Sequence, residues 1–332
     1  MKCIQIDRYG GPEVMVHREL PVPEPAAGEV LVRVCHSGVN FMDVHTRQGK
    51  YRDSRTYPVR LPCTLGMEGA GTVQGVGEGV AGFQSGDRVA WCISWGSYAE
   101  YAVVPARLLA KVPDALPLEM AAASMFHGCT AHYLVNDVGQ LGPGRSCLIH
   151  AATGGVGRLM VQMAQRAGAR VFATTSSPER AALLREGGVR DVLLYENGRF
   201  ADAVREATQG AGVDVVFDAI GRDTLRDSFR ATRRRGLVVN FGSVSGSLKD
   251  LDPIELGEAG SLYLTRPRLA DHLQDGSVVQ SRADAVFGGL CEGWLQVDIA
   301  QRYTLDTVHL GLEALEHRKM VGKPMLSMTP LL

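Results

Sequence analysis

Residues 145–166 read RSCLIHAATGGVGRLMVQMAQR, and this stretch decides the fold. The apolar run CLI predicts a buried strand, and the residues after the glycines have the spacing of an amphipathic helix. Small residues between them let the backbone turn sharply, while free N–H groups and the positive dipole end of the helix attract a diphosphate. The spacing is GGxG and not the full GxGxxG, so a glycine-rich turn without a ligand is the alternative. The position between strand and helix favours a dinucleotide site at Gly154, Gly155, Val156 and Gly157.

Helix and strand patterns alternate on both sides of this turn. From Leu118 onward, apolar runs bounded by glycine predict strands that are buried on both faces of a parallel sheet. Their alternation with helices favours a doubly wound α/β fold. The expected strands are 145–152, 170–176, 214–221 and 236–243, and the expected helices include 118–136, 157–167 and 178–187.

The residues before this region have a different character. Glycine and proline interrupt the first part of the chain at short intervals, and no long helical period precedes residue 117, so a barrel-like β unit is expected. The tail after residue 267 either extends the second domain or returns to the first. Strands are expected at 28–40, 68–80, 86–92 and 97–105, and the tail should contain helices at 281–296 and 306–318 and strands at 299–304 and 322–328.

Composition excludes several classes of protein. The chain has 332 residues, 45% of them hydrophobic and 21% charged, which suits two globular domains. No apolar run is long enough for a membrane span, and the charged N-terminal stretch does not resemble a signal peptide. Seven cysteines without a CxxC pair argue against a disulfide framework, and a net charge of -1 is a poor footprint for nucleic acid. We expect a cytoplasmic protein that binds neither nucleic acid nor membrane.

The end of the second expected strand indicates which dinucleotide binds. An NAD site needs a carboxylate there for the ribose 2′-hydroxyl, yet residues 174–178 read TTSSP. Ser176 offers a hydroxyl and Arg180 a guanidinium, and these groups suit a 2′-phosphate that a carboxylate would repel. The alternative for Arg180 is a solvent-facing helix residue, although the start of a helix favours acids. The sequence predicts NADPH.

With these features in place, the chain resembles the medium-chain dehydrogenase/reductase superfamily along nearly its whole length, and most closely the NADPH:quinone oxidoreductases related to zeta-crystallin. The resemblance implies a GroES-like catalytic domain over 1–122 and 268–332, and a Rossmann NADPH-binding domain over 123–267. The segments that carry it are GGPEV (10–14), GVNFMD (38–43), LGMEGAGTV (65–73), GDRVA (86–90), AAASMFHGCTAHYL (121–134), AATGGVG (151–157), GRDTL (221–225), RRGLVVNFGS (234–243) and GSLYLTRP (260–267).

The residues at the catalytic metal-ligand positions differ from those of zinc-dependent members. Asn40 stands in place of the cysteine ligand, Met67 in place of the histidine, and Phe126 where the third ligand would come. An amide, a thioether and a phenyl ring do not suit a catalytic Zn²⁺. We therefore expect no metal, and a structural role for Glu68, which remains from the same motif.

Without a metal to polarise an alcohol, the natural substrate is an acceptor that is already electrophilic. Asn40 and Tyr51 are candidate hydrogen-bond donors to the acceptor oxygen, and Asp43 could anchor the loop or hold a proton-relay water. Each has a structural alternative: an Asx-type turn for Asn40, loop packing for Tyr51 and a helix N-cap for Asp43. For His45 and His127 the structural interpretation is favoured over proton donation.

The resemblance implies further cofactor contacts, at the carboxyl ends of the parallel strands. Arg266, Arg318 and Lys323 are weaker candidates because each is basic and lies in a segment that the family brings close to the cleft; for Lys323 a surface position is equally expected. The implied contacts are Phe41, Thr130, Arg180, Tyr195, Ile220, Phe241, Gly242, Ser243 and Val244.

Three functions follow from these observations. The first is NADPH-dependent reduction of quinones by direct hydride transfer. The second delivers the same hydride to the C=C bond of an α,β-unsaturated carbonyl compound, including a polyketide-like intermediate. The third is a protein that binds NADPH without turnover, or one that binds RNA. The apolar segment 260–267 is expected at a sheet edge, where it would pair with its copy in a homodimer, as the family does.

Overall fold

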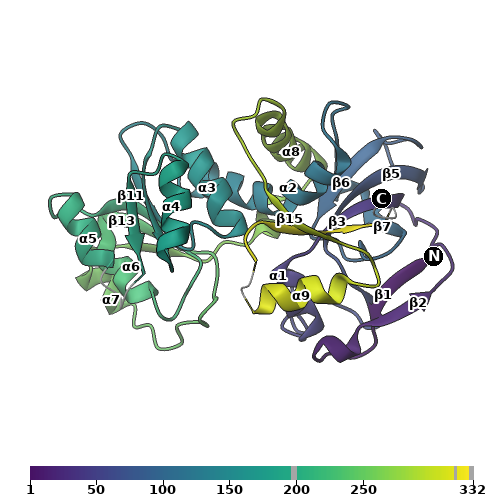
Figure 1. Ribbon diagram of the computed structural model, residues 1–332, viewed down its shortest axis with the longest axis horizontal. Helices are drawn as coiled ribbons and strands as arrows, with labels where there is room; N and C mark the ends of the chain where they lie inside the picture. Colours follow the sequence, from purple (N-terminus) through teal and green to yellow (C-terminus); the bar gives the residue numbers. More distant parts are fainter. Residues whose placement is uncertain (196–199, 318–319, 329–332) are drawn as a thin grey trace. The chain divides into compact units, whose positions relative to one another are not determined.

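The computed structural model describes residues 1–195, 200–317 and 320–328, and it divides into two compact units (Figure 1). Unit 1 comprises Met1–Cys129 and His272–Leu332, and unit 2 comprises Thr130–Asp271. The boundaries thus lie a few residues beyond the expected 122/123 and 267/268. Helix α2 (Leu118–His132) crosses the first boundary.

Unit 1 contains two antiparallel β-sheets and one parallel pair at an edge. The smaller sheet has the order β2-β1-β4, and the larger has the order β15-β16-β3-β5-β6-β8, with β7 also paired to β3. The strands are β1 (Lys2–Ile6), β2 (Val16–Glu19), β3 (Glu29–Gly38), β4 (Cys63–Thr64), β5 (Glu68–Val76), β6 (Arg88–Cys92), β7 (Tyr101–Pro105), β8 (Leu109–Lys111), β15 (Ile299–Tyr303) and β16 (Lys323–Ser327).

The tail of the chain returns to unit 1. Strand β16 pairs antiparallel with β3, placing Met325 opposite Gly38, so the last strand lies beside the one that ends at the candidate catalytic loop. The α-helices that lie wholly within this unit, among the described residues, are α1 (Phe41–Arg47), α8 (Gly276–Cys291) and α9 (Val308–Glu316). Helix α8 starts five residues before the expected 281 because Asp275 caps it, its side chain accepting from the backbone N–H groups of Ser277 and Val278.

Unit 2 contains a six-stranded parallel sheet with the order β11-β10-β9-β12-β13-β14, and the parallel, doubly wound character is the one that the alternating pattern predicted. The chain runs outward from β9 in one direction, then returns to β12 on the other side of β9. Ligands of such folds bind at this switch point, outside the carboxyl ends of the strands. The strands are β9 (Ser146–Ile149), β10 (Arg170–Thr175), β11 (Asp191–Leu194), β12 (Val213–Asp218), β13 (Thr232–Asn240) and β14 (Tyr263–Thr265).

Helices cover both faces of this sheet (Figure 1). Phe200, Val204 and Phe229 join the buried core against the central strands, which places α5 (Phe200–Ala207) and α6 (Leu225–Ala231) on one face. Right-handed crossovers put α3 (Gly155–Arg166) and α4 (Pro178–Glu186) on the other. A short helix, α7 (Ile254–Glu258), precedes β14. The sheet is therefore covered on both sides and is accessible to ligands at its carboxyl edge.

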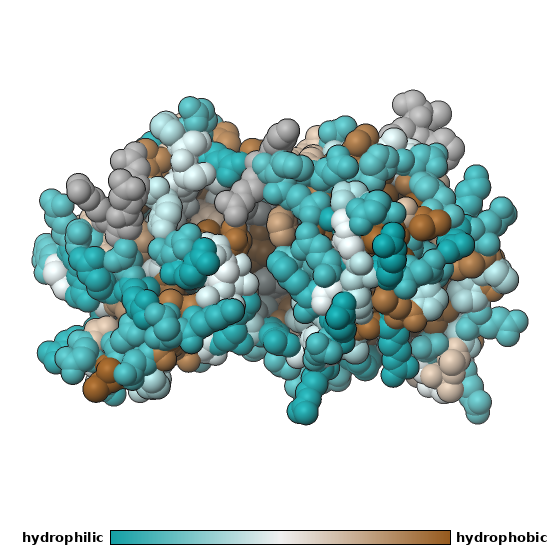
Figure 2. Space-filling view, turned by 90° about the horizontal axis from the view of Figure 1, so that it is seen from below, coloured by the Kyte–Doolittle hydropathy of each residue, from teal (hydrophilic) through white to brown (hydrophobic). Residues whose placement is uncertain are grey.

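The surface is mainly hydrophilic on the face seen in Figure 2, where hydrophobic residues appear as small scattered groups. Among the described residues, no helix combines the length and the apolar character that crossing a membrane requires.

Candidate functional site

The glycine-rich turn of unit 2 lies where the sequence placed it, between β9 and α3. Gly154 precedes the helix with extended dihedral angles (φ -74, ψ 169), and within the described part of the chain no side chain caps this helix end. No acidic residue occupies its first turn, so its N–H groups stay available to an anion. A Cβ on Gly157 would lie 2.3 Å from the backbone oxygen of Ala151, so only glycine fits there. The turn fits the diphosphate of a dinucleotide.

The next strand end carries the groups expected to meet an adenosine 2′-phosphate. Ser176 is exposed just after β10, and Arg180 is half-buried in the first turn of α4. The Ser177 hydroxyl caps α4 by accepting from the N–H of Arg180 at 3.3 Å. Tyr195 follows β11, and its hydroxyl donates to the backbone oxygen of Asp223 at 2.9 Å. Ser176 and Arg180 are therefore the polar groups at this end that suit a phosphate.

The loops after β12 and β13 are tied to each other. The N–H of Phe241 donates to the backbone oxygen of Asp218 at 3.0 Å, and that of Val244 to Ala219 at 3.2 Å. A Cβ on Gly242 would lie 2.3 Å from the oxygen of Ala219, which explains the glycine. The predicted residues Ile220, Phe241, Gly242, Ser243 and Val244 thus share one edge of the sheet.

Four other predicted contacts are more scattered. Thr130 is buried in α2, and Phe41 is 45% exposed at the first position of α1. Arg266 is exposed and directly follows β14. Arg318 lies outside the described residues.

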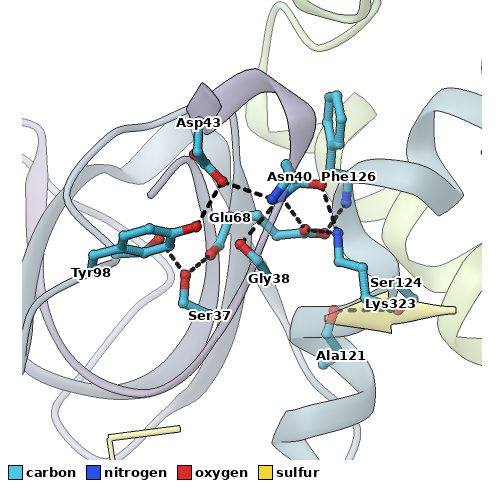
Figure 3. Close-up of polar contacts among 11 residues, drawn as sticks. Ser37, Gly38, Asn40, Asp43, Glu68, Tyr98, Ala121, Ser124, Phe126 and Lys323 are labelled. Carbon is cyan, nitrogen blue, oxygen red and sulfur yellow. Dashed lines mark hydrogen bonds and ion pairs between the residues drawn. The ribbon is translucent and has the colours of Figure 1, made fainter. Parts of the chain in front are cut away.

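Asn40 is buried in unit 1, and its side chain is fully engaged there (Figure 3). The amide nitrogen donates to Glu68 Oε2 at 2.9 Å and to the backbone oxygen of Gly38 at 3.3 Å. The amide oxygen accepts from Lys323 Nζ at 2.7 Å. Because both N–H groups already have protein acceptors, the geometry favours a positioning role for Asn40 over donation to a substrate.

Lys323 forms a buried ion pair with Glu68. Its Nζ lies 2.6 Å from Glu68 Oε2, and the two side chains are 2% and 0% exposed. The other carboxylate oxygen of Glu68 accepts the backbone N–H of Phe126. The surface position considered for Lys323 is therefore wrong: its ammonium contacts Asn40 and Glu68, beside residues that occupy the metal-ligand positions of zinc-dependent members (Figure 3). Within the described residues, no group of three or more His, Cys, Asp and Glu side chains is arranged to hold a metal ion.

Asp43 continues this buried cluster. Its Oδ2 accepts from the backbone N–H of Asn40 at 2.8 Å and from the hydroxyl of Tyr98 at 3.0 Å, so it caps the start of α1 (Figure 3). Its Oδ1 is buried without a partner among the described residues. Burial raises the pKa of Asp43 to about 7, although both hydrogen bonds and Lys323 act to lower it. Asp43 can therefore hold a proton near neutral pH. The N-cap interpretation for it is wrong: Asn40 is the N-cap of α1, and Asp43, the third residue of that helix, completes a capping box by accepting the backbone N–H of Asn40.

Tyr51 lies in an aromatic cluster on the same unit. Its hydroxyl is 3.5 Å from His45 Nδ1, and its ring contacts Tyr57 with a centroid distance of 5.7 Å. Phe41 packs edge-on against His45 at 5.0 Å. Burial, with a smaller effect of Lys50, lowers the pKa of His45 to about 4, so the imidazole is neutral at physiological pH. Burial also lowers the pKa of His127 well below its usual range.

The chain matches known families and proteins over most of its length. The alcohol dehydrogenase GroES-like domain family matches residues 26–114, and the zinc-binding dehydrogenase family matches residues 155–266. A quinone oxidoreductase of Pseudomonas aeruginosa is 38% identical, the match covering 98% of this chain and 99% of the relative. This chain belongs to the quinone oxidoreductase family of medium-chain dehydrogenases/reductases.

Two further proteins are similar to this chain over nearly its whole length. The crystal structure of Escherichia coli quinone oxidoreductase complexed with NADPH has a TM-score of 0.92 and 34% identity, covering 98% of this chain and 100% of that one. A 2-haloacrylate reductase of Burkholderia is 36% identical, with 97% of each chain covered. The predicted family and the predicted pairing of a GroES-like unit with a Rossmann sheet are confirmed.

Two features of this quinone oxidoreductase family member were not predicted from the sequence. One is the role of Lys323. The signal for it was Glu68, because a buried carboxylate with no metal nearby needs another cation. The other is Tyr98, whose hydroxyl reaches Asp43 from 55 residues away in the sequence, with no local signal.

Proposed function

We propose that this protein reduces quinones with NADPH by direct hydride transfer and without a catalytic metal. The observation that carries the proposal is the buried Lys323–Glu68 pair, held by Asn40, among the metal-ligand positions of a chain similar over its full length to quinone oxidoreductases. NADPH supplies the hydride when bound. Quinones accept it without a Lewis acid because they are already electrophilic.

In this proposal the two units have separate roles. Unit 2 binds NADPH, with the diphosphate at the start of α3 and the 2′-phosphate at Ser176 and Arg180. The loops after β12 and β13 hold the remainder of the cofactor through residues between Ile220 and Val244. Thr130, Tyr195 and Arg266 contribute further contacts. Unit 1 positions the acceptor. Asn40 and Asp43 order the start of α1, which carries Phe41.

Tyr51 is the candidate that touches the acceptor. Its phenol can donate to the acceptor oxygen as that oxygen gains negative charge. The neutral imidazole of His45 has one donor and one acceptor nitrogen, so it can orient the phenol through the contact at Nδ1.

Replacing Tyr51 with Phe tests this role. The phenol is lost while the ring packing against Tyr57 remains, so we expect kcat for quinone reduction to fall about tenfold, as one hydrogen bond to a charged group predicts. Steady-state kinetics should show the loss in kcat with little change in the KM for NADPH. Tyr57→Phe is the matched control, and an equal loss in that variant would show that the effect is not specific to the Tyr51 phenol.

A second candidate function is reduction of an activated C=C bond, which the similarity to the 2-haloacrylate reductase favours. Purified protein supplied with NADPH and, separately, with a small quinone or 2-chloroacrylate distinguishes the two. We expect hydroquinone and NADP⁺ in equal amounts, with 2-chloroacrylate turned over more slowly. Faster turnover of 2-chloroacrylate would make C=C reduction the leading function. Tight NADPH binding with no oxidation by either acceptor would support a protein without catalytic function.

A homodimer belongs to the same proposal. Strand β14 ends the sheet of unit 2, its outer edge has no partner strand among the described residues, and Tyr263 on it is 60% exposed. An open apolar edge favours pairing with a second copy. Light scattering should give about twice the mass of the 35.7 kDa chain, and the monomer mass would contradict it.

A cytoplasmic location also stays a prediction, which the seven free cysteines support because they suit a reducing compartment.

A further inference from the structure

Four polar side chains are buried together beneath the carboxyl edge of the unit 2 sheet. His150 follows β9, Thr174 lies near the end of β10, Asp218 ends β12 and Ser228 belongs to α6. Each is at most 2% exposed. They therefore connect three neighbouring strand ends through side chains that no ligand can reach.

The directions of their hydrogen bonds follow from donor and acceptor chemistry. The carboxylate of Asp218 only accepts, so the Ser228 hydroxyl donates its single hydrogen to Asp218 Oδ2 at 2.8 Å. The 3.1 Å contact between Ser228 Oγ and His150 Nε2 then requires a hydrogen on Nε2. Because burial lowers the pKa of His150, the ring is neutral, and its Nδ1 accepts from the Thr174 hydroxyl at 2.8 Å. Only one tautomer of His150 satisfies every contact.

This chain of hydrogen bonds decides which hydroxyls at the end of β10 remain available. Thr174 is committed to His150, and Thr175 Oγ1 lies 3.3 Å from Thr153 Oγ1 on the glycine-rich turn. Both threonines are buried, whereas the next residue, Ser176, is exposed. The end of β10 is thus held against the glycine-rich turn from beneath, and the outward polar groups are Ser176 and, in the first turn of α4, Arg180.

The same carboxylate organises the neighbouring loop. Asp218 Oδ1 accepts from the backbone N–H groups of Ile220 and Gly221 at 2.8 and 2.9 Å. The Thr224 hydroxyl donates to the carboxylate as well. A change at His150 therefore affects the phosphate-facing strand end through Thr174, while Asp218 retains several other donors.

We propose that His150 is a positioning residue for recognition of the 2′-phosphate, holding the end of β10 so that Ser176 and Arg180 face that phosphate. The inference rests on the proposed use of NADPH. It assigns His150 no contact with the cofactor. Replacing His150 should therefore weaken the binding only of ligands that carry the 2′-phosphate. The backbone N–H groups at the start of α3, which bind the diphosphate, do not depend on the Thr174 hydroxyl.

Equilibrium binding of two nicotinamide-free probes, adenosine 2′,5′-bisphosphate and AMP, tests the proposal by calorimetry. His150→Leu removes both ring hydrogen bonds, and we expect the Kd of the bisphosphate to rise about tenfold while that of AMP changes less than about twofold. His150→Gln keeps one acceptor and one donor on the side chain and should restore most of the loss. Arg180→Ala is the positive control, with the same selective loss.

An equal loss of affinity for both probes in His150→Leu would show a general structural role and overturn the proposal, as would unchanged affinity for both. Should the leucine variant fail to fold, Thr174→Val decides, because it removes only the hydroxyl that donates to His150; a selective loss of about threefold is expected and an unselective one is contradictory. Wild-type protein that binds the bisphosphate no better than AMP contradicts the NADPH assignment itself, and the two failures are thereby distinguished.

Discussion

Lys323→Met should lower the free energy of unfolding by about 3–5 kcal/mol, because it leaves the carboxylate of Glu68 buried without its cation. The loss is large because Glu68 is 0% exposed. The Asn40 amide oxygen also loses the donor that it accepts from. Urea unfolding followed by circular dichroism measures the change.

The double variant Glu68→Gln/Lys323→Met separates the charge from the packing. It removes both charges and keeps side chains of similar volume, so most of the lost stability should return. Arg302→Met is the matched control, since Arg302 pairs with Glu119 at 2.6 Å while 49% exposed and should cost no more than about 1 kcal/mol. A double variant as unstable as Lys323→Met would show that packing, and not an uncompensated charge, explains the loss.

Gly157→Ala should raise the Kd for NADPH at least about a hundredfold, the second large effect that the structure predicts. The new Cβ would lie 2.3 Å from the oxygen of Ala151 and 2.9 Å from the Cα of Ala152. Both neighbours are backbone atoms of the turn itself, so the turn must move away from the geometry that presents its N–H groups to the diphosphate. Quenching of protein fluorescence by NADPH measures the affinity.

Gly288→Ala is the control for this substitution. Gly288 lies inside α8, and a Cβ there meets nothing within 4 Å, so alanine should leave NADPH affinity unchanged and raise stability slightly. Affinity within threefold of the wild type for Gly157→Ala would mean that the turn does not bind the diphosphate.

The parts of the site that sequence could predict are local ones. The GGVG turn and the stretch 174–178 carry their signals within a few residues, because a strand end, a turn and a helix start are adjacent in the chain. The parallel sheet of unit 2 followed from the alternation of strand and helix patterns. Helix α8 starts five residues before the expected 281, where Asp275 caps it, and a cap is a local signal as well.

The parts that sequence could not predict depend on pairing between distant segments. Lys323 reaches Glu68 across 255 residues only because β16 lies beside β3 in the sheet of unit 1. That pairing also engages the Asn40 amide, which from sequence alone was a free donor. In unit 2, the tautomer of His150 depends on Ser228, 78 residues away.

Initial rates of quinone reduction by protein dialysed against a strong chelator, measured with NADPH and with NADH at equal concentrations, test the central claim most directly. An NADPH-dependent reductase without a catalytic metal should retain its full rate after dialysis, and NADPH should support that rate at least about tenfold better than NADH. Loss of activity on dialysis that zinc restores, or equal rates with the two cofactors, would contradict the account.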